Sequence, residues 1–237
     1  MKTALSFATL FLFLFLASPA EAHINRLRPL IVFEMSDGVG WLSDSAVQTR
    51  LSRGYTTGWT TIDGRPILTR GFFNFDLKRS LAMTPKNYAV VGAELEFGGI
   101  SYLSPDPLET LGIFDVTTPA ASLYARTHID SMAFNDLGSG VLYASANFSP
   151  GGNDRITIPL NADAIHDIRA NHGGLFSFGL SLISARPSYI TNESLFSLGG
   201  SIPELRILIA RVPEPSTDAI AATSVLALLF IRRRRSL

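Results

Sequence analysis

Short apolar runs, each broken by Gly, Pro, Asn or Asp after roughly ten residues, fill the middle of this chain. Runs of this length and spacing predict short β-strands that are joined by turns and packed as a sandwich or barrel. The clearest run is Tyr88 to Gly98, in which Ala93, Leu95 and Phe97 alternate with two glutamates. A period of two places the apolar side chains on one face of a strand and the glutamates on the other.

The run Gly71 to Leu77 shows the same alternation. Its side chains divide into two faces, one with Phe73, Phe75 and Leu77, the other with Phe72, Asn74 and Asp76. Because this run and the one that begins at Tyr88 flank the segment Lys78 to Lys86, we expect the two strands to pair as antiparallel neighbours. Further strands are expected at Ile31–Met35, Thr110–Val116, Val141–Ala146, Arg155–Pro159, Leu175–Ile183 and Glu204–Val212.

One helix is expected among these strands. Asn161 suits the N-cap, Asp163 lies in the first turn, where the helix dipole favours an anion, and Gly173 suits the left-handed position after the last turn. The pattern therefore predicts an all-β fold, namely a jelly-roll-like β-sandwich with one short helix. No internal repeat or linker divides it, so we expect one domain. Two half-domains that meet near Pro105 to Pro107 are the alternative.

The N-terminus has the form of a secretory signal peptide. Lys2 precedes the apolar run Ala4 to Ala17, and small residues follow that run. We expect cleavage after Ala22, although cleavage after Ala20 also satisfies the small-x-small rule. Residues 1–22 would then be a signal peptide helix, and residues 23–211 the exported domain. A domain of this length buries around 70% of the surface that its unfolded chain would expose.

Residues 212–237 combine a rigid proline pair, an apolar segment and a block of positive charge. The order is Val212, Pro213, Glu214, Pro215 and Ser216, then the apolar run Ala219 to Ile231, then Arg232, Arg233, Arg234 and Arg235. The prolines fix φ and remove two backbone donors, so the motif cannot join a following helix. As a helix the apolar run spans about 20 Å against a hydrocarbon core of about 30 Å, and the arginines stay on the cytoplasmic side. We expect a transient transmembrane helix that is later cut, with an ordinary C-terminal anchor as the alternative.

This C-terminal layout resembles the PEP-CTERM sorting signal of exported bacterial proteins. In that family an exosortase processes the signal, which makes an exosortase the implied partner. The resemblance implies transient anchoring in the inner membrane and then a place on the cell surface or outside the cell. It also implies an association with extracellular polymer and biofilm in bacteria that have an outer membrane.

Four stretches of the exported region resemble the carbohydrate-binding-module-like sandwiches of such proteins. They are residues 70–77, 92–97, 137–140 and 159–164. The resemblance implies a cell-surface or extracellular-matrix protein for which extracellular polysaccharide is the expected ligand.

Charge and cysteine content exclude other classes of protein. Residues 23–211 carry fifteen basic and seventeen acidic residues, and no run of like charge occurs among them. Nucleic acid is therefore not expected as a partner, because phosphate binding needs a concentrated basic face. The chain has no cysteine. An exported domain without disulfides must draw its stability from its core.

Three aromatic residues are the candidate ligand-binding site. Trp41, Tyr55 and Trp59 lie close together in the sequence, beside several threonines. An exposed aromatic face offers a flat apolar platform for a sugar ring, and neighbouring hydroxyls can hydrogen-bond to the sugar. The alternative is that these aromatic residues fill the core.

Catalytic and metal-binding patterns are weak in this sequence. Glu94 and Glu96 would lie about 7 Å apart along a strand, but they project from one face and do not flank a cleft. No zinc-binding spacing links the histidines, which are His23, His128, His166 and His172. His23 would begin the mature chain, as in a histidine-brace copper centre, but no other histidine is clearly placed to complete one. Asp63-Gly64 and Gly151 to Asp154 offer oxygen ligands for calcium, and they equally have the composition of turns.

We therefore expect a non-enzymatic protein with no catalytic residue, cofactor or metal. The alternative is an exported carbohydrate-active or metal-dependent enzyme on the same sandwich. An enzyme predicts a cleft in which two or more charged groups with shifted pKa values converge. A binding module predicts a filled core and an exposed aromatic strip.

Overall fold

The structure is a computed structural model. It describes residues 30–35, 38–45, 50–51, 54–82, 84, 87–125, 131–151, 155–171, 173–186, 192–197 and 203–212. The expected signal peptide, the apolar run near the C-terminus and the arginine block lie outside these residues, as do Pro213 to Ser216 of the sorting motif. Within the described ranges, every helix is too short or too polar to cross a membrane.

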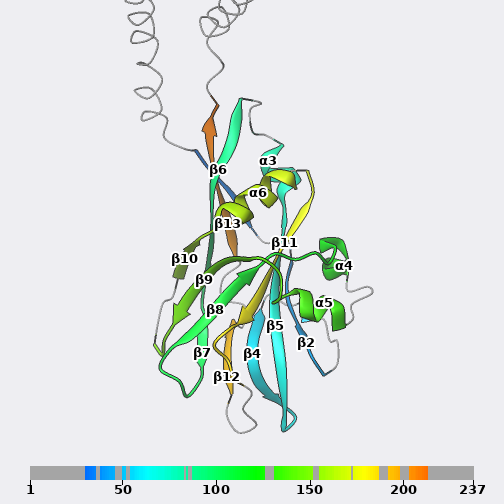
Figure 1. Cartoon of the computed structure of the whole chain (residues 1–237), viewed down its shortest axis with the longest axis vertical. Coiled ribbons are helices and arrows are strands. Elements are labelled where there is room, and N and C mark those ends of the chain that lie inside the picture. The colour runs from blue at the N-terminus through cyan, green and yellow to red at the C-terminus, as the bar shows by residue number, and fades with distance from the viewer. Residues whose placement is uncertain are drawn as a thin grey trace, which may run out of the picture. The chain divides into compact units, whose positions relative to one another are not determined.

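Strands dominate the described residues (Figure 1). The strands are β1 (Leu30–Met35), β2 (Gly38–Ser43), β3 (Arg50–Leu51), β4 (Tyr55–Ile62), β5 (Arg65–Asp76), β6 (Tyr88–Gly98), β7 (Ser101–Leu103), β8 (Glu109–Phe114), β9 (Leu142–Phe148), β10 (Arg155–Pro159), β11 (Leu175–Leu182), β12 (Glu193–Ser197) and β13 (Glu204–Arg211). The helices are α3 (Leu77–Leu81), α4 (Ala120–Ala125), α5 (Ser131–Asp136) and α6 (Ala162–Ala170). The prediction of a mostly β protein is confirmed, but several short helices are present where one was expected.

Two sheets organise these strands. The smaller has the order β1-β13-β6-β10, and the larger has the order β7-β12-β4-β5-β11-β8-β9, with β2 beside β5 and β3 beside β2. Every pairing with a defined register is antiparallel. Antiparallel sheets can bury one face in the core, which matches the alternating sequence pattern.

The chain forms two compact units. The larger contains residues 31–85 and 90–209, and the smaller contains residues 1–30, 86–89 and 210–237. In the smaller unit, the backbone N–H of Val212 donates to the carbonyl of Asn87 at 2.6 Å. The larger unit holds the core and the cavities described below.

Strands β5 and β6 lie in different sheets, so the expected pairing between them is wrong. Residues 94–98 of β6 pair with β10 instead. The two strands meet through their apolar faces, because Phe73 and Phe97 lie 5.7 Å apart between ring centroids. Each strand carries large apolar side chains on one face. These two apolar faces are buried because they pack against each other across the core.

The alternation in β6 and β13 correctly predicts which side chains enter the core. Buried side chains on these strands are Ala93, Leu95 and Phe97 together with Leu205, Ile207 and Ile209. Glu96 does not face solvent as expected, since only 3% of it is exposed. It forms ion pairs with Arg155 and Arg206 and accepts a hydrogen bond from Thr157 Oγ1 at 3.1 Å. A buried charge requires such partners.

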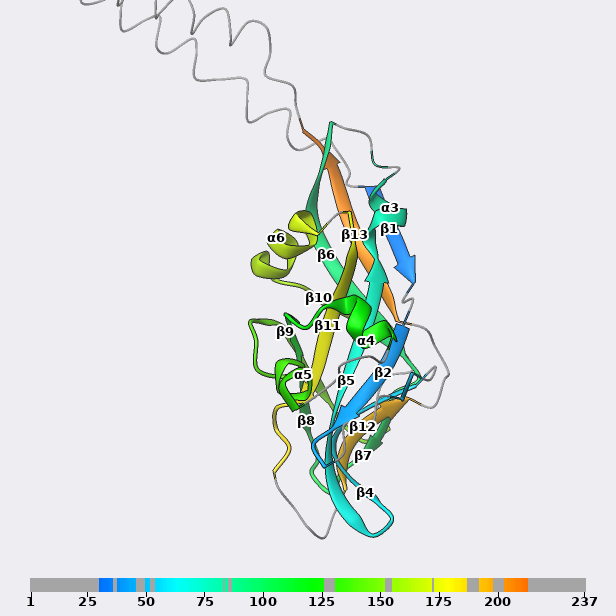
Figure 2. The ribbon, with the colours of Figure 1, turned by 90° about the vertical axis from the view of Figure 1, so that its right-hand side faces the viewer.

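Strand β5 is buried on both faces. Phe73 points into the core, while Phe72 on the opposite face joins a second cluster under helices α4 and α5 (Figure 2). The cluster consists of Leu42, Phe72, Leu123, Ala133, Phe134 and Leu137. We call this face of the large sheet the helix-covered face.

Helix α5 is fixed to the helix-covered face by Arg70 of β5. The Arg70 guanidinium donates from Nη1 to the carbonyls of Phe134 at 2.9 Å and Asn135 at 2.8 Å. It also lies over the Phe134 ring, 4.6 Å from the centroid. Gly179 of β11 allows the close approach, because a Cβ there would lie 2.4 Å from the carbonyl oxygen of Leu137.

Helix α6 begins as predicted. The Asn161 side chain accepts from the backbone N–H of Ala164 at 3.0 Å, and Asp163 lies in the first turn. The helix ends at Ala170, and Asn171 is its C-cap with a φ of −100°. Gly173 is not in the left-handed region, so that detail of the expected stop is wrong.

Candidate functional site

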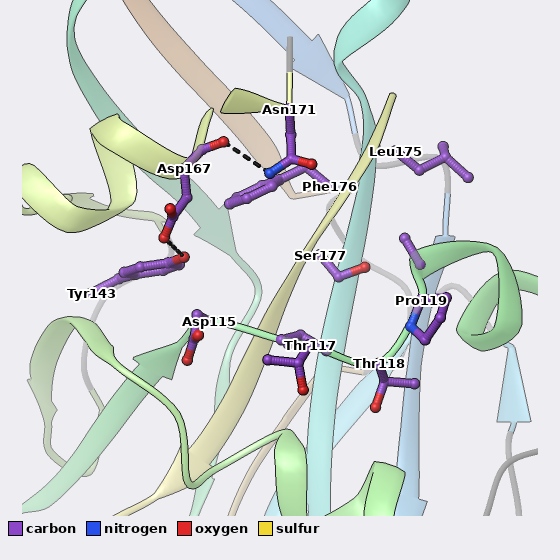
Figure 3. Close-up of a pocket in the computed structure, with 12 residues that line it drawn as sticks. Asp115, Thr117, Thr118, Pro119, Tyr143, Asp167, Asn171, Leu175, Phe176 and Ser177 are labelled. Atoms are coloured by element: carbon purple, nitrogen blue, oxygen red, sulfur yellow. Dashed lines mark hydrogen bonds between the residues drawn. The ribbon is translucent and has the colours of Figure 1, made fainter. Parts of the chain in front are cut away.

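A cavity of about 320 Å³ opens beside the ends of β8 and α6 and the start of β11 (Figure 3). We call it the first cavity. Its described lining residues are Asp115, Val116, Thr117, Thr118, Pro119, Ala120, Tyr143, Asp167, Asn171, Leu175, Phe176 and Ser177. Its volume lies near the lower end of the range of about 300–1,000 Å³ that is usual for ligand pockets.

The segment from Asp115 to Ala120, which follows β8, forms one wall of the first cavity. Its start is tied to the residue before β9, because the N–H of Asp115 donates to the Val141 carbonyl at 2.9 Å and the N–H of Val141 donates back to Asp115 Oδ1. Gly140 is required beside this pair, since a Cβ there would overlap the Asp115 carboxylate. The carboxylate is therefore held in one position at the cavity wall.

Tyr143 and Asp167 form the opposite wall. The Tyr143 hydroxyl donates to Asp167 Oδ2 at 2.6 Å, and the Asn171 side-chain amide donates to the Asp167 carbonyl at 3.0 Å (Figure 3). The Tyr143 ring stacks on Phe176 with 6.4 Å between centroids. Burial, together with the hydrogen bond to Asp167, raises the pKa of the Tyr143 hydroxyl, which keeps it a donor. The bond between Tyr143 and Asp167 thus links β9 to α6.

The electrostatics of the first cavity are acidic. Burial raises the pKa of the Asp115 carboxyl above its ordinary value, and the negative charges of Asp136 and Asp167 raise it further, although the hydrogen bond from Val141 opposes them. None of the described lining residues is Lys, Arg or His. A bound anion would therefore meet carboxylates with no described cationic side chain beside it.

Hydrogen-bond acceptors outnumber donors on these walls. The Val141 N–H donates to Oδ1 of Asp115, and the Tyr143 hydroxyl donates to Oδ2 of Asp167. Among the described residues, none donates to the other oxygen of either carboxylate, Asp115 Oδ2 or Asp167 Oδ1. The Asn171 amide uses one of its two N–H groups to donate to the Asp167 carbonyl. The Ser177 hydroxyl donates to Asn74 Oδ1 at 2.6 Å. The cavity is therefore suited to a ligand that brings its own donors.

A second cavity, of about 520 Å³, shares residues 117–119 with the first. Its described lining residues are Thr117, Thr118, Pro119, Met132, Ala133, Asn135, Asp136 and Ser139. Asp136 accepts from Thr117 Oγ1 at 2.8 Å and from the Thr118 N–H at 2.6 Å. Burial alone would raise the pKa of the Asp136 carboxyl, but the hydrogen bonds from Thr118 and Thr117 outweigh it and lower that pKa.

The structure places Tyr55, one of the three predicted ligand-binding aromatics, in the core. Only 3% of Tyr55 is exposed, and its ring meets Phe73 edge-on at 5.1 Å between centroids. Burial raises the pKa of its hydroxyl. Tyr55 therefore offers no exposed face to a sugar.

The two tryptophans are half-buried and do not converge. Trp41 of β2 pairs with Gly71 of β5, and Trp59 of β4 pairs with Leu68 of β5. Paired residues of antiparallel strands share a face, and successive residues along a strand alternate between faces. Because Gly71 and Leu68 are an odd number of positions apart, Trp41 and Trp59 lie on opposite faces of the sheet.

A separate acidic cluster could hold a cation. Carboxylate oxygens of Asp106, Glu109 and Glu193 lie within 4.8 Å of one another, and Glu109 and Glu193 are buried. Ser104 Oγ donates to Glu109 Oε1 at 2.5 Å, and the Arg186 N–H donates to Glu193 Oε2 at 2.7 Å. Hard cations such as Ca²⁺ prefer oxygen ligands of this kind. Asp106 and Glu109 are three positions apart, but Glu193 lies far along the chain, so no spacing pattern indicates the cluster.

The other metal candidates are less convincing in the structure. Asp63 and Gly64 form a two-residue turn between β4 and β5 with φ of 50° and 75°, which is the conformation of a tight hairpin. Residues 152–154 lie outside the described residues, as do three of the four histidines. The fourth, His166, is exposed on α6.

The sequence did not indicate the first cavity. Asp115 follows one strand, Tyr143 lies on the next, and Asp167 lies on a helix. The order β11-β8-β9 brings the strand segments together. The predicted strands at Thr110–Val116 and Val141–Ala146 and the predicted α6 contain Asp115, Tyr143 and Asp167, but no sequence pattern indicates that these three residues meet.

Comparisons with known proteins give no family. No protein-family model matches the chain, and no curated protein matches it. Among solved structures, similarity is found to the N-terminal CBM22-1 and GH10 modules of endo-1,4-beta-D-xylanase 10B from Clostridium thermocellum, complexed with xylohexaose. The identity is 10%, the match covers 78% of this chain and 29% of that chain, and the TM-score is 0.26. The chain thus matches less than a third of that structure, and a TM-score this low establishes neither a shared fold nor a shared ligand.

Proposed function

We propose that this chain is an exported, non-enzymatic surface or matrix protein whose jelly-roll-like β-sandwich binds a neutral extracellular polysaccharide. The proposed export and sorting rest on the resemblance of residues 212–237 to the PEP-CTERM signal, with an exosortase as the processing partner. The binding site is the first cavity. The Asp115 and Asp167 carboxylates contact the ligand.

The observation that carries the binding proposal is the excess of acceptors in the first cavity. Asp115 and Asp167 each have one carboxylate oxygen without a described donor. Sugar hydroxyls are donors, and hydrogen bonds from a neutral donor to a carboxylate are stronger than neutral pairs. The Val141 N–H and the Tyr143 hydroxyl fix the two carboxylates in place, so little order is lost on binding.

The charge of the site selects against acidic polymers. Asp115 and Asp167 line the cavity with Asp136 close by, and no described lining residue is cationic. A uronic acid would bring a further negative charge to this site. We therefore expect neutral polysaccharides to bind and polyuronates to be rejected.

Affinity electrophoresis of the full-length chain through gels that contain neutral or uronic-acid polysaccharides tests this function. Asp115→Asn and Asp167→Asn should abolish the retardation by a neutral polymer. Asp163→Asn is the matched control, because Asp163 is exposed on the same helix α6 and does not line the cavity. Retardation that survives both cavity variants but is lost in Trp41→Ala or Trp59→Ala would move the site to the aromatic residues.

The proposed export and sorting are tested separately from binding. Mass spectrometry of the protein from its native cells should show a mature chain without residues 1–22 and without Arg232 to Arg235. Recovery of the intact arginine block in the mature protein would rule out sorting by exosortase. Loss of the N-terminal segment alone would indicate the ordinary C-terminal anchor.

One observation favours a second candidate, a glycoside hydrolase at the same cavity. Glycosidases use two carboxyl groups, one of which has a raised pKa and acts as the acid. Burial raises the pKa of the Asp115 carboxyl, and the nearby negative charge of Asp167 raises it further. New reducing ends released from a bound polysaccharide, and lost in Asp115→Asn, would favour the enzyme. Binding without release supports the module.

A further inference from the structure

The two cavities lie on either side of one short wall. Thr117, Thr118 and Pro119 line both of them. Thr117 and Pro119 are exposed, and Thr118 is half-buried. A ligand that fills the first cavity can therefore extend over this wall without entering the core.

The wall is held rigidly on both sides. Asp136 accepts hydrogen bonds from Thr117 Oγ1 and from the Thr118 N–H, so its two carboxylate oxygens are both engaged. Pro119 fixes its own φ, and its carbonyl accepts from the N–H groups of Ser122 at 2.8 Å and Leu123 at 3.2 Å at the start of α4. Asp136 is thus a positioning residue. A preformed wall of this kind adds little ordering cost to binding.

The far side of the wall offers groups of a different chemistry. Met132 is 74% exposed, an unusual position for a large apolar side chain. Asn135 and Ser139 are exposed beside it in the second cavity. An apolar surface next to an amide and a hydroxyl suits the apolar face and the hydroxyl edge of a sugar ring.

Resting on the function proposed above, we propose that the ligand is a linear, neutral glycan chain that occupies both cavities. One sugar unit lies in the first cavity against Asp115 and Asp167. The chain then crosses Thr117 to Pro119, and a later unit packs on Met132 in the second cavity. The site therefore recognises the interior of a polymer or an oligomer, and a single sugar fills only part of it.

Isothermal titration calorimetry on the full-length chain in mild detergent tests this proposal. The probes are neutral β-1,4-linked oligomers of glucose, xylose, mannose and N-acetylglucosamine, from one to six units long. For the series that binds, we expect the affinity to rise at least about tenfold from one unit to the longer oligomers. Met132→Ala should remove that rise and leave the affinity for one unit unchanged, whereas Asp115→Asn should weaken binding at every length.

Leu108→Ala is the control for removing an exposed apolar side chain, since Leu108 is 51% exposed and lines neither cavity. A second variant, Asn135→Ala, probes the same cavity through a polar group and should also reduce the rise. Affinity that does not depend on length, or a Met132→Ala protein that matches Leu108→Ala at every length, overturns the two-cavity proposal. If Asp115→Asn still abolishes binding in that case, the proposed function stands. If no series binds, both proposals fail.

Discussion

The two faces of strand β5 differ in what packs against them. Toward the small sheet, Phe73 packs edge-on with Tyr55 and Phe97 in a core filled with rings. On the opposite face, Phe72 lies in a smaller cluster beneath two short helices. The core face is closed and apolar. Beyond the ends of the strands, loops and helices carry carboxylates and hydroxyls and line two cavities, the first of which also contacts Tyr143 and Phe176 of the core face.

This difference explains where a ligand can bind. The three aromatic residues that the sequence predicts as a sugar-binding platform do not form one. Tyr55 is buried in the core, and Trp41 and Trp59 lie on opposite faces of the sheet. Asp115 and Asp167 are each held through one carboxylate oxygen and keep the other for a ligand. Stability and binding therefore draw largely on different residues, although Tyr143 serves both, and mutations should separate them.

The largest expected effect is on the core face. Phe73→Ala should lower the free energy of unfolding by about 3–5 kcal/mol, because it removes a fully buried ring and leaves a cavity. Urea denaturation followed by tryptophan fluorescence measures this. A loss below about 1 kcal/mol would mean that the ring is not part of a packed core.

A smaller effect is expected where the helix-covered face is fixed to the sheet. Arg70→Met keeps the aliphatic stem but removes the hydrogen bonds to the carbonyls of α5, and should cost about 1.5–3 kcal/mol. Hydrogen exchange should show faster exchange at residues 131–139 and unchanged exchange in β6. Uniform acceleration throughout the domain would contradict a local role.

Tyr143→Phe tests the link between β9 and α6. Loss of the hydroxyl leaves Asp167 Oδ2 without its donor and should cost about 0.5–1.5 kcal/mol. Because Asp167 is then free to turn, binding to the first cavity should weaken by more than folding stability does. Calorimetric binding and thermal denaturation of the same variant measure the two effects. Equal loss in both would mean that the bond serves stability alone.

The smallest effect concerns the wall between the cavities and depends on pH. The pKa of Asp136 is lowered, so its stabilisation is fully present above the unfolded value near pH 4 and is lost as the pH falls through the folded pKa. Asp136→Asn should therefore be less stable than the wild type at pH 6, by about 0.5–1 kcal/mol from the weakened hydrogen bonds. The two proteins should converge in stability toward pH 2. A constant difference from pH 6 to pH 2 would show that the charge of Asp136 contributes nothing.

Alternation predicts those parts of the fold in which each strand has one buried face. It places Ala93, Leu95 and Phe97 in the core, as it does the apolar residues of β13. It fails for β4, which was not predicted as a strand. Thr57 is fully buried there because its hydroxyl donates to the Leu180 carbonyl and accepts from the Leu182 N–H, both at 3.1 Å. A buried threonine that bonds to another strand cannot be told from a surface threonine by local pattern.

The site lies beyond sequence reasoning for a related reason. Asp115, Tyr143 and Asp167 belong to separate elements, and strand order alone brings them together. Asp167 also looks like an ordinary exposed residue of an amphipathic helix until its bond to Tyr143 is seen. The interruption of β9 pairing between Ile113 and Phe114, which accompanies Tyr143, has no sequence signal.

The central claim is that the first cavity, with Asp115, Tyr143 and Asp167 in its walls, and not the aromatic residues of β2 and β4, receives a neutral glycan. Backbone amide shifts in ¹H–¹⁵N NMR during titration with a neutral oligosaccharide test it most directly. The account predicts shifts at residues 115–118, at Tyr143 and at Asp167 to Asn171, with Trp41 and Trp59 unchanged. Shifts confined to Trp41 and Trp59, with the cavity residues unmoved, would contradict it.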